Sequence, residues 1–278
     1  MTIEVLDFAA DGALKKEMEF FAENKDQARN DFTDLKTRDE VRRYVEDRFE
    51  YKDIVALARS TPACRVLDVG VAYGVTSAYL ALHGHEVTAV EPSMDMCREM
   101  AALFKRLDIP VKVVAGTGES INQIKSTFDL VVFYSSLHHC DDPEKALRNA
   151  REKLVDGGRV FLWEPVLKFY RTKAWFYKTL ETNPEQLGHY GGNEHIYRAG
   201  EYAGFAGRAG FSKVSFEPSV TYGLVPKRAP WDSDTRYAVK KFYFAAVRGF
   251  VLKGPLGIII RPILFRLSLL NPVIKATR

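Results

Sequence analysis

The chain has 278 residues, of which 46% are hydrophobic and 27% are charged. This suits one large globular domain, or one domain with a substantial appendage, and excludes collagen-like, low-complexity and disordered chains. The net charge of +4 is uneven, because residues 226–278 carry eleven Lys or Arg against two Asp, a net +9, and leave the preceding residues at −5. A mildly acidic body without a recognisable reading module argues against nucleic acid as a partner.

The first seventeen residues, MTIEVLDFAADGALKKE, contain no basic segment followed by an apolar run, so we expect no secretory signal. Three isolated cysteines, Cys64, Cys97 and Cys140, favour free thiols in a reducing compartment over a structural zinc site or a disulfide framework. We therefore expect a cytoplasmic protein, and we predict no metal site.

Residues 11–59 show helical periodicity, which predicts an N-terminal helical cap over residues 1–60. From residue 64 onward, short apolar runs alternate with amphipathic segments. The clearest helices are expected over residues 94–107 and from the Asp142-Pro143 pair to the glycines at 157 and 158. The runs with strand character are residues 65–69, 86–91, 111–116, 128–134 and 159–164.

Alternation of strands and helices predicts an α/β fold, a Rossmann-like, open and mostly parallel sheet with helices on both faces. We expect the core to cover residues 61–220, between the N-terminal cap and a C-terminal amphipathic extension over residues 221–278. In such a sheet, ligands bind beyond the carboxyl ends of the strands, where the strand order reverses. Functional residues are expected at that edge.

A short glycine loop follows the first of these strands, in the sequence VLDVGVAYGVTSAYL. Gly70 is expected to supply an unusual backbone angle, and Gly74 a close approach at the start of a helix near Val75. Glu91 ends the next strand, seventeen residues beyond Gly74. An acid at this position can accept hydrogen bonds from both hydroxyls of a ribose. The alternative is a solvated carboxylate at a strand end.

The loop reads G-V-A-Y-G, with neither the GxGxxG pattern of dinucleotide sites nor a Walker lysine. It resembles the first motif of the class I S-adenosylmethionine-dependent methyltransferases, whose ligand carries no phosphate. The resemblance covers about residues 64–165. FDLVVFYSSLHHCDDPEKAL and REKLVDGGRVFLWEP are similar to the corresponding block of the small-molecule methyltransferases of the ubiquinone-methylating type.

The resemblance implies S-adenosylmethionine as cofactor, with its ribose on Glu91 and its adenine beside the sequence GTGES. Two positions depart from the family pattern. Ala72 stands where the middle glycine usually lies, and Thr117 where many members have an aspartate that reaches the adenine. The residues expected to bind the cofactor are Asp68, Gly70, Ala72, Tyr73, Gly74, Glu91, Pro92, Ser93, Thr117, Gly118, Glu119 and Tyr134.

Methyl transfer from a sulfonium is an in-line displacement, and a hydroxyl acceptor gains from a general base. His138 and His139 follow the fourth strand at the ligand-binding edge, as base candidates or as residues that stabilise the fold. His195 lies next to Glu194 in a glycine-containing loop, either as a further base candidate or at an exposed helix entry. A metal site formed by Glu194, His195 and His189 matches no strong spacing pattern. His83 and His85 are expected at the opposite edge of the sheet.

Residues 165–197 mix aromatic and basic side chains, which favours a lid that selects the acceptor; the alternative is a helix packed on the sheet. The tail is too interrupted to span a bilayer. Residues 253–275 predict an interfacial helix on an anionic membrane, or else a terminal helix docked on the body or on a second copy. The oligomeric state is left open.

The sequence therefore predicts methyl transfer from S-adenosylmethionine to a small, lipid-linked or glycan-linked acceptor, at oxygen. The glycan class is suggested by the pattern NEHIY-x(4)-EY-x(6)-AGF, which resembles methyltransferases found with surface-polysaccharide enzymes. Two alternatives are a NAD-dependent oxidoreductase, disfavoured by the loop spacing, and a non-catalytic cofactor-binding or membrane-associated scaffold protein.

Overall fold

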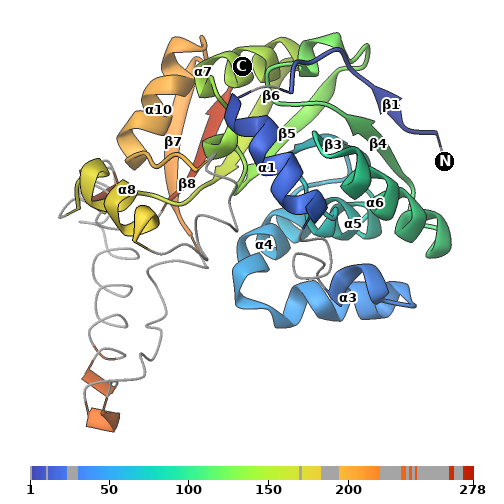
Figure 1. Cartoon of the computed structure of the whole chain (residues 1–278), viewed down its shortest axis with the longest axis horizontal. Helices are drawn as coiled ribbons and strands as arrows, with labels where there is room; N and C mark the ends of the chain where they lie inside the picture. The colour runs from blue at the N-terminus through green and yellow to red at the C-terminus, as the bar shows by residue number, and fades with distance from the viewer. Residues whose placement is uncertain are drawn as a thin grey trace.

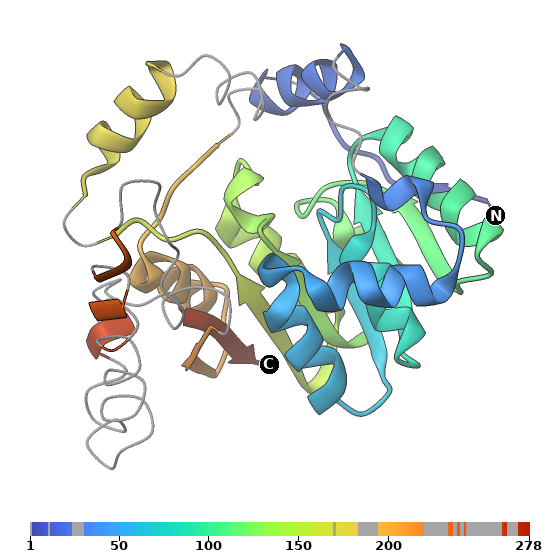
Figure 2. The same cartoon turned by 90° about the horizontal axis from the view of Figure 1, so that it is seen from below.

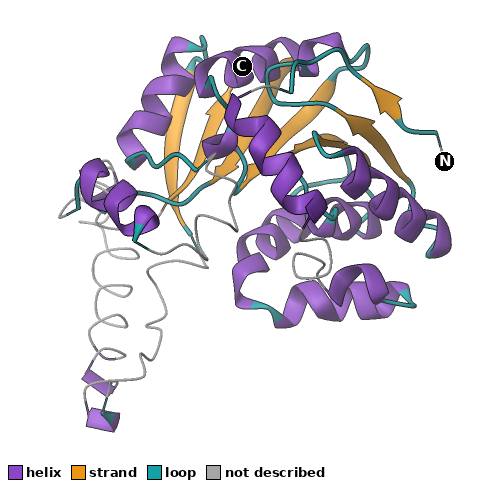
Figure 3. Cartoon of the chain, in the orientation of Figure 1, coloured by secondary structure: helices purple, strands orange, loops and turns teal. Residues whose placement is uncertain are grey.

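The computed structural model describes residues 2–10, 12–23, 31–168, 171–182, 194–219, 233–235, 238–239, 242, 263–265 and 272–278. Over these ranges, an eight-stranded sheet in the order β1-β4-β3-β2-β5-β6-β8-β7 lies between two layers of helices (Figures 1 and 3). Its strands are β1 Glu4–Val5, β2 Arg65–Val69, β3 Glu86–Glu91, β4 Val111–Ala115, β5 Phe128–Tyr134, β6 Leu154–Trp163, β7 Lys213–Pro218 and β8 Pro272–Thr277.

The predicted α/β fold and its five predicted strands are confirmed. Strands β1 to β6 pair in parallel, and β8 runs antiparallel to both β6 and β7. Successive residues of β2 face opposite layers, since Val66 belongs to one hydrophobic cluster and Leu67 to the other. A parallel sheet buried on both faces explains why these strands are nearly continuous apolar runs.

Helices α3 Arg38–Asp47, α4 Lys52–Ser60, α5 Val75–Leu82 and α6 Met94–Arg106 cover one face of the sheet, and α7 Pro143–Lys153 and α10 Ala199–Arg208 cover the other (Figure 1). The helix α7 begins as predicted, because the Asp142 side chain accepts a hydrogen bond of 2.9 Å from the Lys145 amide. It ends before the two expected glycines. These glycines lie instead within β6, where Gly157 has a φ of +75°.

The N-terminal region is divided where the sequence suggested continuous helix. It contains α1 Gly12–Glu23, a 3-10 turn at Asp31–Asp34, α3, a second turn at Phe49–Tyr51, and α4. Figure 2 shows α1 (dark blue) and α8 Lys173–Glu181 (yellow) beyond the same edge of the layered core. The strand β1 pairs with β4 at the border of the sheet, so the N-terminal segment contributes to the core as well as capping it.

The chain end completes the sheet. β8 lies between β6 and β7, so the expectation that its residues belong to an extension outside the core is wrong. Residues 272–275 of the expected membrane segment 253–275 are therefore a strand, and Val273 and Ile274 are buried rather than available to lipid. Residues 253–262 and 266–271 lie outside the described residues. Among the described helices, none is long and apolar enough to cross a membrane.

Replacement of one β8 side chain tests how far the core depends on this strand. Ile274 is buried against the layer formed by α7 and α10, whereas the neighbouring Lys275 pairs with the exposed Glu217. We expect Ile274→Ala to lower the free energy of unfolding by about 2–4 kcal/mol in urea denaturation, because it leaves a cavity in a packed core. Lys275→Ala is the matched control and should cost under about 1 kcal/mol. Equal effects would contradict the burial of this strand.

Candidate functional site

The strand order reverses between β2 and β5. From β2 the chain continues outward through β3 and β4, and it then returns to β5 on the other side of β2. The loops that follow these two strands meet, because the Ser136 hydroxyl donates a hydrogen bond of 2.6 Å to the Val69 carbonyl. A Cβ atom on Gly70 would stand 2.5 Å from the Ser136 Cβ, so this contact requires glycine. The two loops at the edge predicted to bind ligands are therefore in direct contact.

The glycine loop has the expected backbone. Gly70 and Gly74 have φ angles of +72° and +78°, and α5 begins at Val75. The Gly70 amide donates to the Val90 carbonyl at 2.8 Å, which fixes the loop against β3. A Cβ atom on Gly74 would stand 2.5 Å from the Met100 sulfur, so glycine allows the close packing of α5 on α6.

Two other residues at this edge have strained backbone angles. Of the non-glycine residues that the structure describes, Ala72, Asp108 and Ser135 have positive φ, at +49°, +50° and +57°. Ala72 follows β2 and Ser135 follows β5, so both lie at the strand reversal, and both are exposed. Left-handed angles in residues with a Cβ atom are costly, and they cluster at functional sites. The position of the missing family glycine therefore keeps a glycine-like backbone.

Asp68 supports the loop from within the core. Its carboxylate is 1% exposed and accepts hydrogen bonds from the Thr76 hydroxyl at 2.6 Å and the Ser77 hydroxyl at 2.7 Å. Burial raises the pKa of Asp68 to about 6, although both hydroxyls oppose the shift. These contacts fix the first turn of α5 to the end of β2. Asp68 thus positions the predicted cofactor loop.

Glu91 is the carboxylate that faces the loop. One of its oxygens accepts from the Ala72 amide at 2.8 Å and the other from the Ser93 amide at 3.0 Å. The residue is only 6% exposed, so the alternative of a solvated strand-end carboxylate is wrong. Burial raises the pKa of Glu91 to about 7, against the two amide hydrogen bonds. Further hydroxyl donors would stabilise the charged form.

The other expected cofactor residues lie around this edge with different surroundings. Tyr73 is buried in the hydrophobic core, and Pro92 is half-buried. The Thr117 amide donates to the Ser120 hydroxyl at 2.9 Å, which closes the turn after β4. Gly118 packs against α7, where an added Cβ would stand 3.0 Å from the Ala146 Cβ.

Glu119 and Tyr134 are occupied by contacts within the chain. One Glu119 carboxylate oxygen accepts from the Asp142 amide at 3.2 Å. The Tyr134 ring stacks on Trp163 with centroids 4.5 Å apart, and its hydroxyl donates to the Glu50 carbonyl. Tyr134 therefore joins the N-terminal cap to the end of β5.

His138 is buried between two carboxylates. Its Nδ1 lies 2.6 Å from the Glu164 Oε2, and its Nε2 lies 3.6 Å from the Glu194 Oε2. Burial lowers the pKa of His138, but the hydrogen bond to Glu164 and the charges of Glu164 and Glu194 outweigh burial and raise the pKa to about 9. A histidine that holds its proton at neutral pH is a poor general base.

The remaining histidines differ in their contacts and in their place in the fold. His139 is half-buried, with Nδ1 3.1 Å from the Glu17 Oε1 and Nε2 3.6 Å from the Glu194 Oε2. Burial lowers the pKa of His195, so this imidazole is neutral at pH 7. The expectation for His83 and His85 is confirmed, since both lie between α5 and the start of β3, at the other edge of the sheet.

Comparison with known proteins agrees with the geometry at this edge. Residues 67–162 match the family model described as a methyltransferase domain. This part of the chain is a class I methyltransferase domain. Its cofactor is S-adenosylmethionine, as the resemblance implied.

Curated relatives align over the same part of the chain. The Schizosaccharomyces pombe protein named mitochondrial ubiquinone biosynthesis O-methyltransferase is 31% identical over 101 residues, which are 35% of this chain and 36% of that protein. A ubiquinone biosynthesis O-methyltransferase of Xanthomonas campestris is 30% identical over 112 residues, 40% of this chain and 46% of the relative. The matched segments thus span less than half the length of these relatives.

Solved structures share the fold at low sequence identity. The YcgJ protein of Bacillus subtilis is 14% identical, with a TM-score of 0.52 over 81% of this chain and 97% of that one. The plantazolicin methyltransferase BpumL, solved in complex with a monoazolic desmethylPZN analog and SAH, is 10% identical, with a TM-score of 0.53 over 96% of this chain and 95% of that one. Both likenesses show the fold.

The residues of this methyltransferase domain fit the cofactor. A carboxylate has about four acceptor positions, and Glu91 uses one on each oxygen for a backbone amide. The remaining positions suit the two hydroxyls of a ribose. Residues 70–76 contain no Lys or Arg, as suits a ligand without phosphate. Glu91 would hold the ribose, and the loop from Gly70 to Gly74 would lie against the rest of the cofactor.

Sequence reasoning missed two site residues, Glu164 and Glu17. Glu164 directly follows β6, as an acid at a strand end like Glu91, and this pattern was a usable signal. Glu17 lies in α1 among other charged residues, and nothing in its sequence context marks it. Within the expected lid, the structure describes residues 165–168, 171–182 and 194–197. His189 lies outside the described residues.

Removal of the Glu91 carboxylate should weaken the cofactor site. We expect Glu91→Ala to lower the affinity for S-adenosylhomocysteine about 30-fold or more in calorimetric titration, since each hydrogen bond to a charged group is worth about 1.5–3 kcal/mol. Glu86→Gln at the exposed start of the same strand is the matched control and should bind normally. Unchanged affinity in Glu91→Ala would contradict the assignment.

The raised pKa of Glu91 also predicts a pH dependence. The carboxylate is charged above about pH 7, the form that two hydroxyl donors favour, and it takes up a proton as the pH falls through that value. We therefore expect the affinity for S-adenosylhomocysteine to fall between pH 8 and pH 6. In Glu91→Gln, affinity should be low and should lack this dependence. If the wild type and Glu91→Gln showed the same pH dependence of affinity, the titrating group would be a residue other than Glu91.

Proposed function

We propose that this chain transfers the methyl group of S-adenosylmethionine to an oxygen of a small acceptor. The observation that carries this proposal is the buried Glu91 carboxylate, held against a glycine loop without phosphate-binding residues inside a methyltransferase domain. The same loop disfavours a NAD-dependent oxidoreductase, because a dinucleotide needs donors for its pyrophosphate. Oxygen as the acceptor atom is supported by the names of the curated relatives, which are O-methyltransferases.

The cofactor supplies an electrophilic methyl group, and the residues of the chain align it and exclude water. Glu91 binds and orients the cofactor. His195 accepts the proton of the acceptor hydroxyl, since its pKa is lowered and it lies next to the His138 backbone, to whose carbonyl its amide donates at 3.3 Å. His138 acts as a positioning residue.

The acceptor side is formed by the lid and by α1. Trp175 and Tyr177 of α8 are 42% and 37% exposed, and the Arg171 guanidinium lies 3.6 Å from the Trp175 ring centroid. Exposed aromatic and basic groups suit an apolar ring, a sugar or a lipid-linked molecule that carries an acidic group. Precursors of ubiquinone belong to the acceptors to be tested, on the strength of the relatives' names.

We further propose a cytoplasmic protein that contacts anionic membranes.

Parallel titrations test the proposed function. The full chain should bind S-adenosylmethionine and S-adenosylhomocysteine saturably in a calorimeter and should not bind NADH. With S-adenosylmethionine labelled in its methyl group, label should move to a hydroxyl of one acceptor in a panel of ubiquinone precursors, lipid-linked sugars and sugar nucleotides. Binding of NADH alone would overturn the proposal. Cofactor binding without transfer to any of them would favour the scaffold alternative.

Once an acceptor that reacts has been found, substitution of His195 tests the role of this residue as a general base. We expect His195→Gln to lower kcat about 100-fold or more, within the usual contribution of a general base, while the affinity for S-adenosylhomocysteine stays unchanged. His83→Gln at the opposite edge of the sheet is the matched control. An unchanged kcat would remove His195 from the mechanism.

A further inference from the structure

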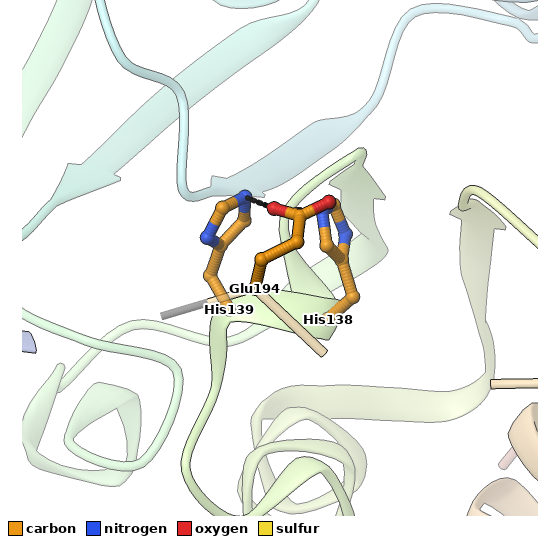
Figure 4. Close-up of side chains that lie close together, drawn as sticks. All are labelled: His138, His139 and Glu194. Carbon is orange, nitrogen blue, oxygen red and sulfur yellow. Dashed lines mark ion pairs between the residues drawn. The ribbon is translucent and has the colours of Figure 1, made fainter. Parts of the chain in front are cut away.

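Three potential ligand atoms converge beside the strand reversal. The Nε2 atoms of His138 and His139 each lie 3.6 Å from the same oxygen, the Glu194 Oε2. One ligand atom from each of the three side chains lies within 4.8 Å of the other two. Figure 4 shows the two imidazole rings on either side of the Glu194 carboxylate. Metal–ligand bonds of about 2.0–2.2 Å place neighbouring tetrahedral ligands a little over 3 Å apart, close to this spacing.

The outer nitrogens of both rings face carboxylates. The His138 Nδ1 lies 2.6 Å from Glu164, and the His139 Nδ1 lies 3.1 Å from the Glu17 Oε1. Glu164 is itself fixed by the Ser136 and Leu137 amides, which donate to its Oε1 at 3.1 and 2.9 Å. Carboxylates on the outer nitrogen are the usual partners of metal-ligating histidines, since they fix the tautomer that leaves Nε2 free for the metal.

One oxygen of the Glu194 carboxylate lacks a hydrogen-bond donor within the part of the chain that the structure describes. Its side chain is 11% exposed, and its Oε2 is buried with no hydrogen-bond partner among the described residues. The distance of 3.6 Å to each imidazole is too long for a hydrogen bond. A buried carboxylate oxygen without donors is costly, and a cation between it and the two imidazoles would remove that cost.

The position of Glu194 depends on the fold around it. Val166 and Tyr197 form a parallel bridge, and the Leu167 amide donates to the Tyr197 carbonyl at 2.9 Å. The His195 amide donates to the His138 carbonyl at 3.3 Å. These bonds hold the segment carrying Glu194 against the loop carrying both histidines, so the three side chains meet on a paired backbone.

We propose that His138, His139 and Glu194 bind one divalent transition-metal ion, Zn²⁺ fitting best, with a fourth position left for the oxygen of the acceptor. Two imidazoles and one carboxylate are a ligand set found in catalytic metal sites, which leave one coordination position open for water or substrate. The sequence predicts no metal site, and the weaker alternative of His189, Glu194 and His195 shares only Glu194 with this set. Metal binding would displace the proton of His138.

The role of the ion rests on the proposed function. A hydroxyl bound in the open position loses its proton more easily, because the cation stabilises the oxyanion. The proton passes to the His195 imidazole and the oxygen attacks the methyl carbon. The new O–C bond forms as the C–S bond breaks, and the electron pair of that bond stays on sulfur, giving S-adenosylhomocysteine.

Metal titration of the untagged, chelator-treated full chain tests the site without any acceptor. We expect one Zn²⁺ per chain by calorimetry in competition with a chelator, and one Co²⁺ with ligand-field absorption typical of nitrogen and oxygen ligands. His139→Ala and Glu194→Gln should each weaken Zn²⁺ binding at least 100-fold. Glu164→Gln should weaken it about 10- to 100-fold, as expected for a carboxylate behind a metal-bound histidine.

His83→Ala is the matched control, a histidine outside the cluster whose loss should leave Zn²⁺ affinity unchanged. Binding of S-adenosylhomocysteine reports whether each variant is folded, and it tests the proposed function independently of the metal. No stoichiometric ion in the folded wild-type chain, or unchanged affinity in both ligand variants, would overturn the site. Stoichiometric Zn²⁺ with a methyl-transfer rate that does not change on its removal would overturn its catalytic role.

Discussion

Two buried carboxylates at strand ends hold the loops on which this site depends. Glu91 at the end of β3 accepts an amide hydrogen bond from the loop that follows β2. Glu164, directly after β6, accepts amide hydrogen bonds from the loop that follows β5. Backbone donors from a neighbouring loop compensate each buried charge, and the charge in turn fixes the loop. The strand reversal is therefore built as one unit, with strained angles at Ala72 and Ser135 held in place.

The same contacts separate the roles of these two acids. Glu164 accepts four hydrogen bonds, from the amides of Ser136, Leu137 and His138 and from the His138 ring. Its acceptor positions are filled, so it is a supporting residue. Among the described residues, Glu91 accepts two, and its raised pKa reflects a carboxylate with too few donors for its burial. Residual acceptor capacity at a buried acid is what a ligand with two hydroxyls can use.

Elements from distant parts of the chain meet at the proposed acceptor side. Glu17 reaches the site from α1, near the N-terminus, and Glu194 reaches it from the segment before α10. Both meet His139, which follows β5 in the middle of the chain. The proposed cofactor loop and Glu91 lie within the continuous unit β2-α5-β3, whereas the residues of the proposed acceptor side come from separated segments. This division fits a fold in which the cofactor is constant and the acceptor varies.

The parallel sheet, its five consecutive strands, the glycine loop and the acid that faces it can all be predicted from the amino-acid sequence. These features are local, since apolar runs, glycines and a strand-end acid appear in short stretches of chain. The place of β8 in the sheet, and the meeting of Glu17, Glu164 and Glu194 around the two histidines, follow instead from long-range packing. Contacts between residues so far apart depend on how the whole chain packs, and no periodicity or spacing in the sequence carries that information.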